Sequence, residues 1–454
     1  MEKVAKITFC SGTGSVTGAN FLIEVDGKKI LVDCGLIQGV NFADNLNWDP
    51  FLYDPKKIDI LFVTHVHEDH IGRIPKLIHE GFKGKIYSTI PSKSLAGPIF
   101  EDTINILSKS KEYSLDKIYS EENIKKALSL WEGVEYHEKI KITENLEVSF
   151  LNAGHILGSA MIEFLYNKKK IVFTGDLGNS PSPILPDCER ITDADYLIME
   201  SVYGDRNHES RYDRKDMLED VIEANVKRKG TLMIPTFSLE RTQELLFEIN
   251  DLIEKGSIPL VPFFLDSPLA IRLTDIYRKF ESYLNEEALN LIRSGKDIFV
   301  FPGLQPTLEA AQSRTIQRMP NPKIIIAGSG MSAGGRIVHH EKQYLPDPNN
   351  TLLLTGYQSV GSPGRLIQEG IKTVHIYGED VTVRARVVTI HGYSGHKDST
   401  ALLNFVEDTQ ETLRKVFVVM GEPKSSMFLV QKIRDNLGIE ARMPEAGESV
   451  SLVC

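Results

Sequence analysis

Short apolar runs separated by turn residues dominate the first part of the chain. Residues 7–10, 20–25 and 29–33 are rich in β-branched and aromatic side chains, and Asp26-Gly27 is typical of a hairpin turn. Helical spacing of apolar positions predicts helices over 74–81 and within 96–132. Further apolar runs predict strands at 58–63, 85–88, 147–151, 159–166, 170–173 and 196–199. We therefore expect a first region built mainly from short strands.

From about residue 205, predicted helices and strands alternate. The strands are expected at residues 231–234, 259–264, 298–301, 323–327 and 352–355. The helices are expected near residues 211–229, 239–255, 267–295, 306–317 and 335–343. This alternation is typical of a doubly wound parallel sheet with helices on both faces.

The last part of the chain returns to hairpin-like sequence. Residues 374–377 and 381–390 flank the turn Gly378-Glu379-Asp380, and residues 416–420 predict one more strand. We therefore expect an insertion, with a first domain over 1–204 and 371–454 that is interrupted by a second domain over 205–370. Because no flexible linker separates these regions, we expect the two domains to pack firmly with a cleft between them.

Polar groups follow five of the predicted strands of the first region. These groups are Asp33, the cluster His65-Val66-His67-Glu68-Asp69-His70, His155, Asp176 and Glu200. The chain holds twelve histidines, so three within six residues beside an aspartate favour a metal site over a solvated loop. Imidazoles and carboxylates gathered at one rim are what a metal site with an open coordination position requires.

Each of the remaining strand-end groups also has a plainer interpretation when taken alone. Asp33 and Asp176 could form turns, and His155 alone would more often be a hydrogen-bonded structural histidine. Asp33 could instead orient a metal-bound histidine. Together with the histidine cluster, His155 and Asp176 are better interpreted as ligands.

Length and composition bound the class of protein. A chain of 454 residues with 41% hydrophobic residues is expected to hold two domains with full cores. The net charge of −10 gives no overall basic field, so any polyanion site must be a local basic cleft assisted by bound cations. The four scattered cysteines argue against a disulfide framework or a cysteine zinc knuckle. Without a signal-peptide core or a run long enough to span a bilayer, we expect a cytoplasmic protein without membrane contact.

These motifs together resemble the β-CASP group of the metallo-β-lactamase superfamily. The ligand pattern of residues 65–70 with Asp33, His155 and Asp176 resembles the superfamily, and residues 200–206 (ESVYGDR) look like the signature that opens the β-CASP domain. Further similar stretches are residues 328–336 (GSGMSAGGR), 356–358 (GYQ) and 392–396 (GYSGH). The resemblance spans nearly the whole chain and is greatest to prokaryotic ribonucleases related to the mRNA 3′-end processing endonuclease.

The resemblance implies an α/β fold, namely a four-layer αββα sandwich with an inserted α/β β-CASP domain. It also implies two Zn²⁺ ions. His65, His67 and His155 would hold the first ion, and Asp69 and His70 would hold the second. Asp176 would bridge the two ions. Asp33 would lie next to the ligands without binding a metal itself, and Glu200 would pair with His396.

The implied chemistry suits phosphodiester hydrolysis. Zinc lowers the pKa of bound water to about 7, which supplies a hydroxide nucleophile, and it stabilises the attacking and leaving oxygens. His396 would protonate the leaving oxygen, since histidine titrates in the right range and a carboxylate partner favours its protonated form. Asp69 could help to orient the nucleophilic water.

Substrate contacts are expected from the second domain. The glycine-rich turn after the strand at 323–327 offers backbone N–H groups at a helix start, which suits a phosphate, although a tight packing turn explains the glycines as well. The expected contacts are Ser329, Gly330, Met331, Arg241 and Arg336, with Arg365 as a further candidate for a phosphate contact.

The chain departs from the family pattern at Met420. The relatives that process RNA 3′ ends carry a histidine here, which ligates the second metal, whereas a thioether is a poor zinc ligand. We therefore expect weaker occupancy of the second site, so that one or two ions are bound.

The leading hypothesis is a metal-dependent ribonuclease that cuts single-stranded RNA in the cleft between the domains, with homodimerisation expected from resemblance alone. Met420 leaves a DNA nuclease of the Artemis type as an alternative, because that branch also lacks the histidine. A non-catalytic RNA-binding relative and a hydrolase of small esters are further alternatives. The retained motif residues argue against the former, and the large inserted domain argues against the latter.

Overall fold

Most apolar positions of the first strands are buried, and these strands belong to one of two large sheets. The computed structural model describes residues 4–38, 45–107 and 115–454. Two compact units divide the chain: the first comprises the described residues within 1–180, 187–207 and 396–454, and the second comprises 181–186 and 208–395. Among the described helices, none is both long and apolar enough to cross a membrane.

The first unit contains two seven-stranded sheets. One has the order β22-β1-β2-β3-β4-β5-β6, with β1 Val4–Ser11, β2 Asn20–Val25, β3 Lys28–Val32, β4 Ile60–Phe62, β5 Lys85–Thr89, β6 Trp131–Val134 and β22 Ser449–Val453. The other has the order β21-β20-β11-β10-β9-β8-β7, with β7 Ile140–Lys141, β8 Leu146–Asn152, β9 Ala160–Tyr166, β10 Lys169–Phe173, β11 Tyr196–Met199, β20 Lys415–Val418 and β21 Glu440–Arg442.

Aromatic side chains pack the inner faces of these sheets against each other. Phe9 of β1 contacts Phe417 of β20, with ring centroids 5.4 Å apart, and Phe62 of β4 lies 5.9 Å from Phe150 of β8. These residues belong to one continuous buried core. Close contacts of this kind place the sheets face to face, as in a β-sandwich.

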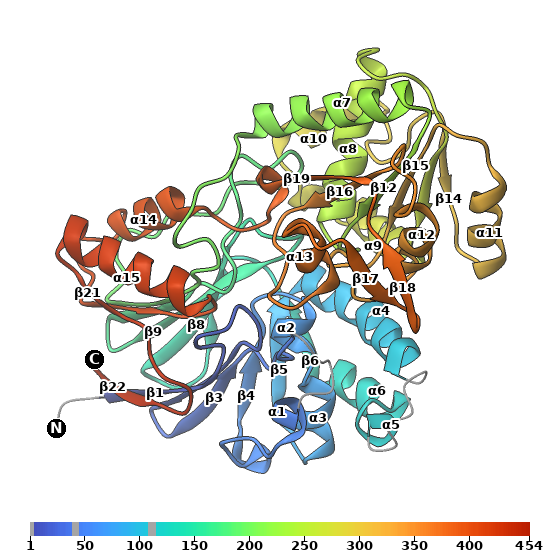
Figure 1. The fold of residues 1–454 in the computed structure, drawn as a ribbon. Coiled ribbons are helices and arrows are strands. Elements are labelled where there is room, and N and C mark those ends of the chain that lie inside the picture. The colour runs from blue at the N-terminus through green and yellow to red at the C-terminus, as the bar shows by residue number, and fades with distance from the viewer. Residues whose placement is uncertain (1–3, 39–44, 108–114) are drawn as a thin grey trace. The chain divides into compact units, whose positions relative to one another are not determined.

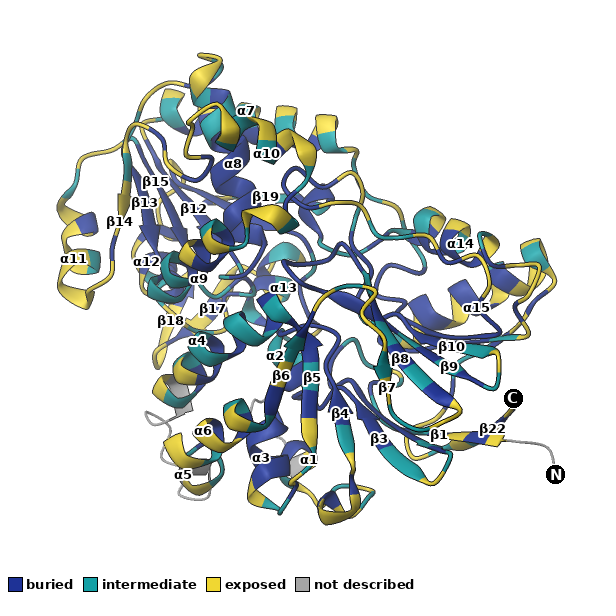
Figure 2. Cartoon of the chain, turned by 180° about the vertical axis from the view of Figure 1, so that it is seen from behind, coloured by how far each residue is buried: buried dark blue, intermediate teal, exposed yellow. Residues whose placement is uncertain are grey.

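Helices form the outer layers of the first unit (Figures 1 and 2). The helices α14 Ser399–Glu407 and α15 Pro423–Leu437 cover the second sheet and share a buried cluster with its strands. The helices α4 Ile90–Leu107 and α6 Glu121–Leu130 pack beside β5 and β6 of the first sheet. The remaining helices of this unit are α1 Asn45–Trp48, α2 Glu68–Ile71, α3 Ile74–His79 and α5 Leu115–Ile118. The predicted αββα sandwich is therefore confirmed.

The second unit is built on a six-stranded parallel sheet of order β14-β13-β15-β12-β16-β19. Its strands are β12 Thr231–Pro235, β13 Phe263–Asp266, β14 Leu304–Pro306, β15 Lys323–Ala327, β16 Thr351–Thr355 and β19 Arg386–Ile390. Every residue of β12, β13, β15 and β16 is buried, as expected when helices cover both faces of a parallel sheet. The predicted doubly wound sheet is confirmed.

The other elements of the second unit surround this sheet. The helices are α7 Arg211–Lys227, α8 Arg241–Glu254, α9 Pro268–Lys279, α10 Glu286–Arg293, α11 Ala310–Thr315, α12 Ile337–Tyr344 and α13 Pro363–Gln368. A separate hairpin is formed by β17 Thr373–Ile376 and β18 Glu379–Thr382. Single 3-10 turns occur in this unit at η2 Glu281–Tyr283, η3 Ile316–Arg318 and η4 His391–Tyr393, and in the first unit at η1 Pro55–Lys57.

Two strand predictions were wrong. Residues 298–301 form a turn, and the strand starts later, at Leu304. Val300 is exposed, whereas aromatic packing buries the two phenylalanines of the run, with the Phe301 ring 5.2 Å from Phe263 and the Phe299 ring 6.2 Å from Tyr277. The single strand predicted at 381–390 is split into β18 and β19, which belong to different sheets.

Because of this split, the chain returns to the first unit at a later residue than the sequence pattern predicts. The sequence pattern places the return at residue 371, whereas the first unit resumes at His396. The difference arises because β19 pairs in parallel with β16, from Thr351 opposite Arg386 to Thr355 opposite Ile390. The last strand of this β-rich segment, β19, is thus part of the parallel sheet, and β17 and β18 form their own hairpin in the same unit.

Candidate metal centre and active site

The polar groups that follow five strands of the first unit come together at one place. Asp33 follows β3, the histidine cluster follows β4, His155 follows β8, Asp176 follows β10 and Glu200 follows β11. The turn after β4 leads directly into α2. His67, whose backbone is extended, is the N-cap residue of this helix. This backbone lets His65, His67 and His70 point toward the same rim from one short segment.

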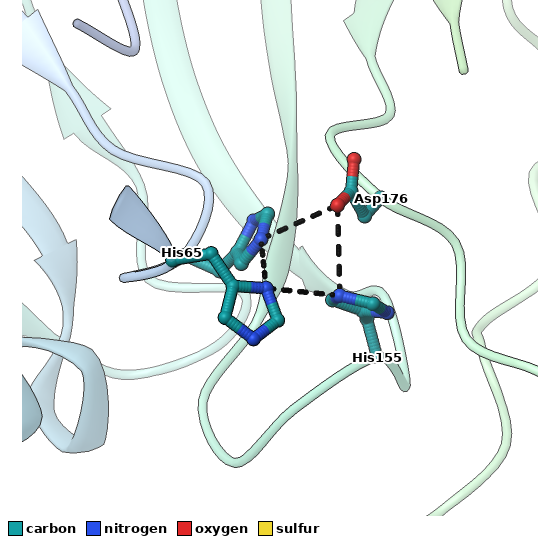
Figure 3. Close-up of side chains that lie close together, drawn as sticks. His65, His155 and Asp176 are labelled. Carbon is teal, nitrogen blue, oxygen red and sulfur yellow. Dashed lines mark hydrogen bonds and ion pairs between the residues drawn. The ribbon is translucent and has the colours of Figure 1, made fainter. Parts of the chain in front are cut away.

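Four side chains form a compact set of metal-type ligands. One ligand atom each of His65, His67, His155 and Asp176 lies within 4.8 Å of the others. Asp176 Oδ2 is 3.4 Å from His65 Nε2 and 3.5 Å from His155 Nε2, and the side chains point toward one another (Figure 3). His67 Nδ1 is 3.0 Å from His65 Nε2 and 3.3 Å from His155 Nε2. Three imidazoles and a carboxylate are a donor set that suits zinc.

The protonation of His65 agrees with this interpretation. Burial, followed by the nearby His70 imidazole, holds the pKa of His65 well below its usual value. A neutral imidazole has a lone pair for a cation, whereas an imidazolium has none. His65 is completely buried, so its orientation is fixed by the surrounding fold.

A second set of groups surrounds His70. Its Nδ1 lies 2.8 Å from Asp33 Oδ2, and Asp33 also accepts hydrogen bonds from the backbone and the hydroxyl of Thr64. The other nitrogen, Nε2, lies 3.3 Å from Asp176 Oδ1 and 4.0 Å from Asp69 Oδ2. Burial raises the pKa of Asp69 to about 6, against the lowering effect of His70.

Two buried atoms of this second set test whether a cation fits here. His70 Nε2 and Asp176 Oδ1 are both buried; they form an ion pair with each other at 3.3 Å, but neither makes a hydrogen bond among the described residues. Buried polar groups are seldom left unpaired in proteins. A cation between His70, Asp69 and Asp176 would satisfy both atoms, so these residues fit a second metal.

Met420 lies on the His70 side of the centre. With His70, Asp33, Thr64 and Phe173 it lines a small buried cavity. Its backbone has a positive φ of 47° and its N–H donates to the Gly12 carbonyl at 2.7 Å. The structure thus brings Met420 together with the proposed second set, as an apolar neighbour.

Glu200 and His396 form a pair beside the ligands. His396 Nδ1 lies 3.1 Å from Glu200 Oε1 and 4.0 Å from Asp176 Oδ2, and its ring is 4.7 Å from that of His155. Glu200 also accepts hydrogen bonds from the N–H groups of Leu177 and Val202. Burial alone would lower the pKa of His396, but the Glu200 carboxylate outweighs it and raises this pKa to about 9.

The predicted substrate contacts belong to the second unit, where the two arginines are already paired. Arg241 is buried and bonded to Glu244. Arg336 donates to Asp266 at 2.7 Å and to the carbonyls of Thr307 and Leu308. A contact between either arginine and a substrate therefore remains a prediction.

The glycine-rich loop lies between β15 and α12, as predicted. It contains Ser329, Gly330 and Met331, and side-chain and backbone donors hold its carbonyls. Gln358 donates to the carbonyl of Gly330, and the Gly364 N–H donates to that of Met331. The role of this loop in substrate binding remains a prediction.

One residue that shapes the centre was missed by the sequence reasoning. The Thr64 hydroxyl donates to Asp33 at 2.8 Å and lies 3.1 Å from His65 Nδ1 and 3.3 Å from His70 Nδ1. Its position directly before the histidine cluster was the available signal. A hydroxyl group that hydrogen-bonds to a metal ligand helps to fix the orientation of that ligand.

Three family models match the chain in succession. Residues 22–198 match the metallo-beta-lactamase superfamily domain, and residues 242–367 match the Beta-Casp domain. Residues 380–444 match the Zn-dependent metallo-hydrolase RNA specificity domain. The first model ends close to Glu200, and the third contains both His396 and Met420.

Relatives of known name cover nearly the full chain. A ribonuclease of Thermus thermophilus is 34% identical over 96% of this chain and 97% of its own length. An RNase J-like protein of Methanocaldococcus jannaschii is 33% identical over 94% of each chain. The transcription termination factor FttA of Methanosarcina mazei is 31% identical over 100% of this chain and 72% of its own.

A solved structure supports the fold alone. A protein of unknown function from Enterococcus faecalis matches with a TM-score of 0.57 and 14% identity, over 99% of this chain and 100% of that one. Family models, full-length relatives and the geometry of the strand ends all agree. The chain belongs to the β-CASP group of the metallo-β-lactamase superfamily.

Proposed function

We propose that the chain is a zinc-dependent ribonuclease that hydrolyses phosphodiester bonds of single-stranded RNA. The observation that carries the proposal is the position of Asp176. Its carboxylate is 3.4 Å from His65 in the ligand set and 4.0 Å from His396 in the acid pair. Groups that could hold a metal and a group that could protonate a leaving oxygen therefore share one centre.

The ligands are assigned from this geometry. His65, His67, His155 and Asp176 would hold one ion, and Asp69, His70 and Asp176 would hold another. When bound, zinc supplies charge stabilisation for phosphate oxygens and lowers the pKa of water to about 7. Asp33 and Thr64 fix the ring of His70 through its Nδ1 side.

His396 is the proposed general acid. Glu200 accepts from its ring and stabilises the protonated form, which keeps a proton available near neutral pH. The N–H groups of Leu177 and Val202 hold Glu200 in turn, so the pair is fixed from both sides. General acids of this kind contribute about 10²–10⁴-fold to a rate.

RNA is proposed as the substrate class because of the relatives and the third family model. Two of the relatives are named as ribonucleases or RNase J-like, and the model over residues 380–444 is that of an RNA specificity domain. Ser329, Gly330, Met331, Arg241 and Arg336 remain the proposed contacts in the second unit. Homodimerisation remains expected from the family resemblance, and light scattering measures it.

The test compares matched 5′-labelled RNA and DNA strands with the zinc-loaded protein. We expect cleavage of the RNA, and a loss of about 10²-fold or more in His396→Ala. Asp380→Asn, on the exposed β17–β18 hairpin, is a control expected to keep full activity. Uncut RNA with stoichiometric zinc bound would contradict the proposal. Preferential cutting of the DNA strand would show that DNA, and not RNA, is the preferred substrate.

A further inference from the structure

The second unit contains a buried network of charges around one aromatic ring. The Arg214 guanidinium lies over the Tyr393 ring at 4.7 Å and donates to Glu248 Oε1 at 2.9 Å. The Tyr393 hydroxyl donates to the other oxygen of Glu248 at 2.5 Å. Arg241, paired with Glu244, lies 5.8 Å from the same ring. All five side chains are buried, and two arginines balance two glutamates.

The same network binds the backbone of the segment that contains Tyr393. Arg214 donates to the carbonyl of Gly392 at 2.7 Å, and the N–H of Gly392 donates to Glu209 at 2.6 Å. A Cβ at Gly392 would lie 2.8 Å from the Glu209 carbonyl and 3.0 Å from Arg214 Cβ, so only glycine fits. Both polar groups of this peptide and the next side chain are therefore held by charged groups.

The chain continues from this anchor directly to His396. Only Ser394 and Gly395 separate Tyr393 from His396, which is bonded to Glu200 in the first unit. Three residues span about 10 Å at most, so the anchor lies within that distance of His396. The following residue is also held, since the Lys397 N–H donates to the Leu177 carbonyl at 2.8 Å.

We infer that Arg214, Glu248 and Tyr393 are positioning residues that set the place of His396. The inference rests on the proposed function, in which His396 is the general acid. None of the three residues is assigned a contact with the reacting atoms. Their contribution is to fix the peptide of Gly392 and the ring of Tyr393, and through them the point from which His396 reaches Glu200.

The chemistry of the network favours positioning over stability. Buried ion pairs lose hydration, and replacing them by apolar side chains is often neutral or stabilising. Charged hydrogen bonds are short and directional, which suits the holding of one backbone geometry. An apolar core at this place would bury the ring as well but would leave the Gly392 peptide without its two charged partners.

The test is Glu248→Gln, measured against a matched control on the same helices. The change keeps the shape of the side chain and removes the charge that Arg214 and Tyr393 bind. Asp251→Asn is the control, because Lys215 and Asp251 join α7 and α8 through a more exposed ion pair. Each variant is assayed on RNA and on a nitrophenyl phosphodiester, whose leaving group departs without a proton.

We expect kcat on RNA to fall about tenfold or more in Glu248→Gln, with KM little changed. On the nitrophenyl ester the same variant should keep the wild-type rate, since no acid is needed. In a His396→Ala background, Glu248→Gln should add no further loss on RNA. Tyr393→Phe, which removes one hydrogen bond, should show the same pattern with a smaller effect.

Equal losses on both substrates would overturn the inference, because a general disturbance of the fold acts on both. An unchanged kcat on RNA in Glu248→Gln would overturn it too, as would a full additional loss in the His396→Ala background. These outcomes are separate from failure of the proposed function, in which the wild-type protein itself leaves RNA uncut.

Discussion

Two buried aspartates at strand ends, one in each unit, differ in what surrounds them. Asp176 follows β10, and its Oδ1 faces His70 Nε2 at 3.3 Å but accepts no hydrogen bond among the described residues. Asp266 ends β13 and accepts hydrogen bonds from Thr307, Ser313, Arg336 and His340. A buried acid at the end of a strand is therefore not by itself a site; an oxygen that accepts no hydrogen bond distinguishes one that can bind a cation.

The histidines beside these aspartates show the same contrast. Three imidazoles gather near Asp176, and their nitrogen atoms lie 3.0–3.3 Å from one another. His340 instead points its Nε2 at Asp266 at 2.8 Å. Imidazole nitrogens that converge with a carboxylate form a donor set that suits a metal, whereas His340 pairs with a carboxylate that already accepts hydrogen bonds from three other side chains.

The largest expected effect is that of Asp176→Asn. The amide removes the negative charge shared by both proposed metals, so bound zinc should fall and RNA cleavage should drop about 10³-fold. Elemental analysis of the purified variant measures the zinc, and a cleavage assay measures the rate. Wild-type zinc content in this variant would contradict the assignment of Asp176 as a ligand.

The matching change in the second unit, Asp266→Asn, should act on stability instead. Removing the charge of one partner of a buried ion pair lowers the free energy of unfolding by about 3–5 kcal/mol. In this variant, Arg336 and His340 would be left without their carboxylate acceptor. Denaturant unfolding measures this loss. Zinc content should stay at the wild-type value, and a loss of zinc here would remove the contrast between the two aspartates.

A third buried acid of the second unit gives a pH-dependent effect. Burial raises the pKa of Glu341 to about 7, although the Ser332 hydroxyl donates to it and opposes the rise. Between pH 4.5, the ordinary value, and about 7, the unfolded chain is ionised while the folded chain keeps the proton. Stability is therefore highest below this window and falls as the pH rises through it, by about 3 kcal/mol in total.

Glu341→Gln should remove that pH dependence. Urea unfolding at pH 5 and pH 8 compares the variant with the wild type, and Glu379→Gln on the exposed β18 strand is the control. The wild type and the control should lose stability between the two pH values, and Glu341→Gln should not. An equal loss in all three would assign the pH effect to other groups.

The smallest expected effect is that of Met420→His. Since Met420 lines the same cavity as His70, an imidazole there could complete the second ligand set, whereas a thioether cannot. Bound zinc should rise from about one toward two per chain, with a modest gain in rate. A wild-type content near two would show that Asp69, His70 and Asp176 hold the second ion without a further ligand.

The sequence predicted those parts of the molecule in which local pattern and final environment agree. The strands of the parallel sheet are continuous apolar runs because both of their faces are covered, and the run at 323–327 has the observed bounds of β15. Close spacing of His65, His67 and His70 made the metal cluster visible. The run at 298–301 failed as a strand because aromatic packing buries a turn as readily as it buries a strand.

The charged network around Tyr393 could not be predicted in the same way. Arg214, Glu248 and Tyr393 are far apart in the chain and carry no shared spacing. The sequence does not distinguish a buried arginine from an exposed one, and Arg241 was therefore predicted to contact a phosphate. Burial and pairing are properties of the fold, and they decide which charges remain available to a ligand.

The division of the first unit into separate stretches of chain has a consequence for synthesis. Every proposed metal ligand lies before residue 177, whereas His396 and the strands β20, β21 and β22 follow the second unit. A growing chain on the ribosome therefore carries its metal ligands more than two hundred residues before its acid. The Glu200–His396 pair is therefore complete only after the second unit has been synthesised, because Glu200 precedes residues 208–395 of that unit and His396 follows them.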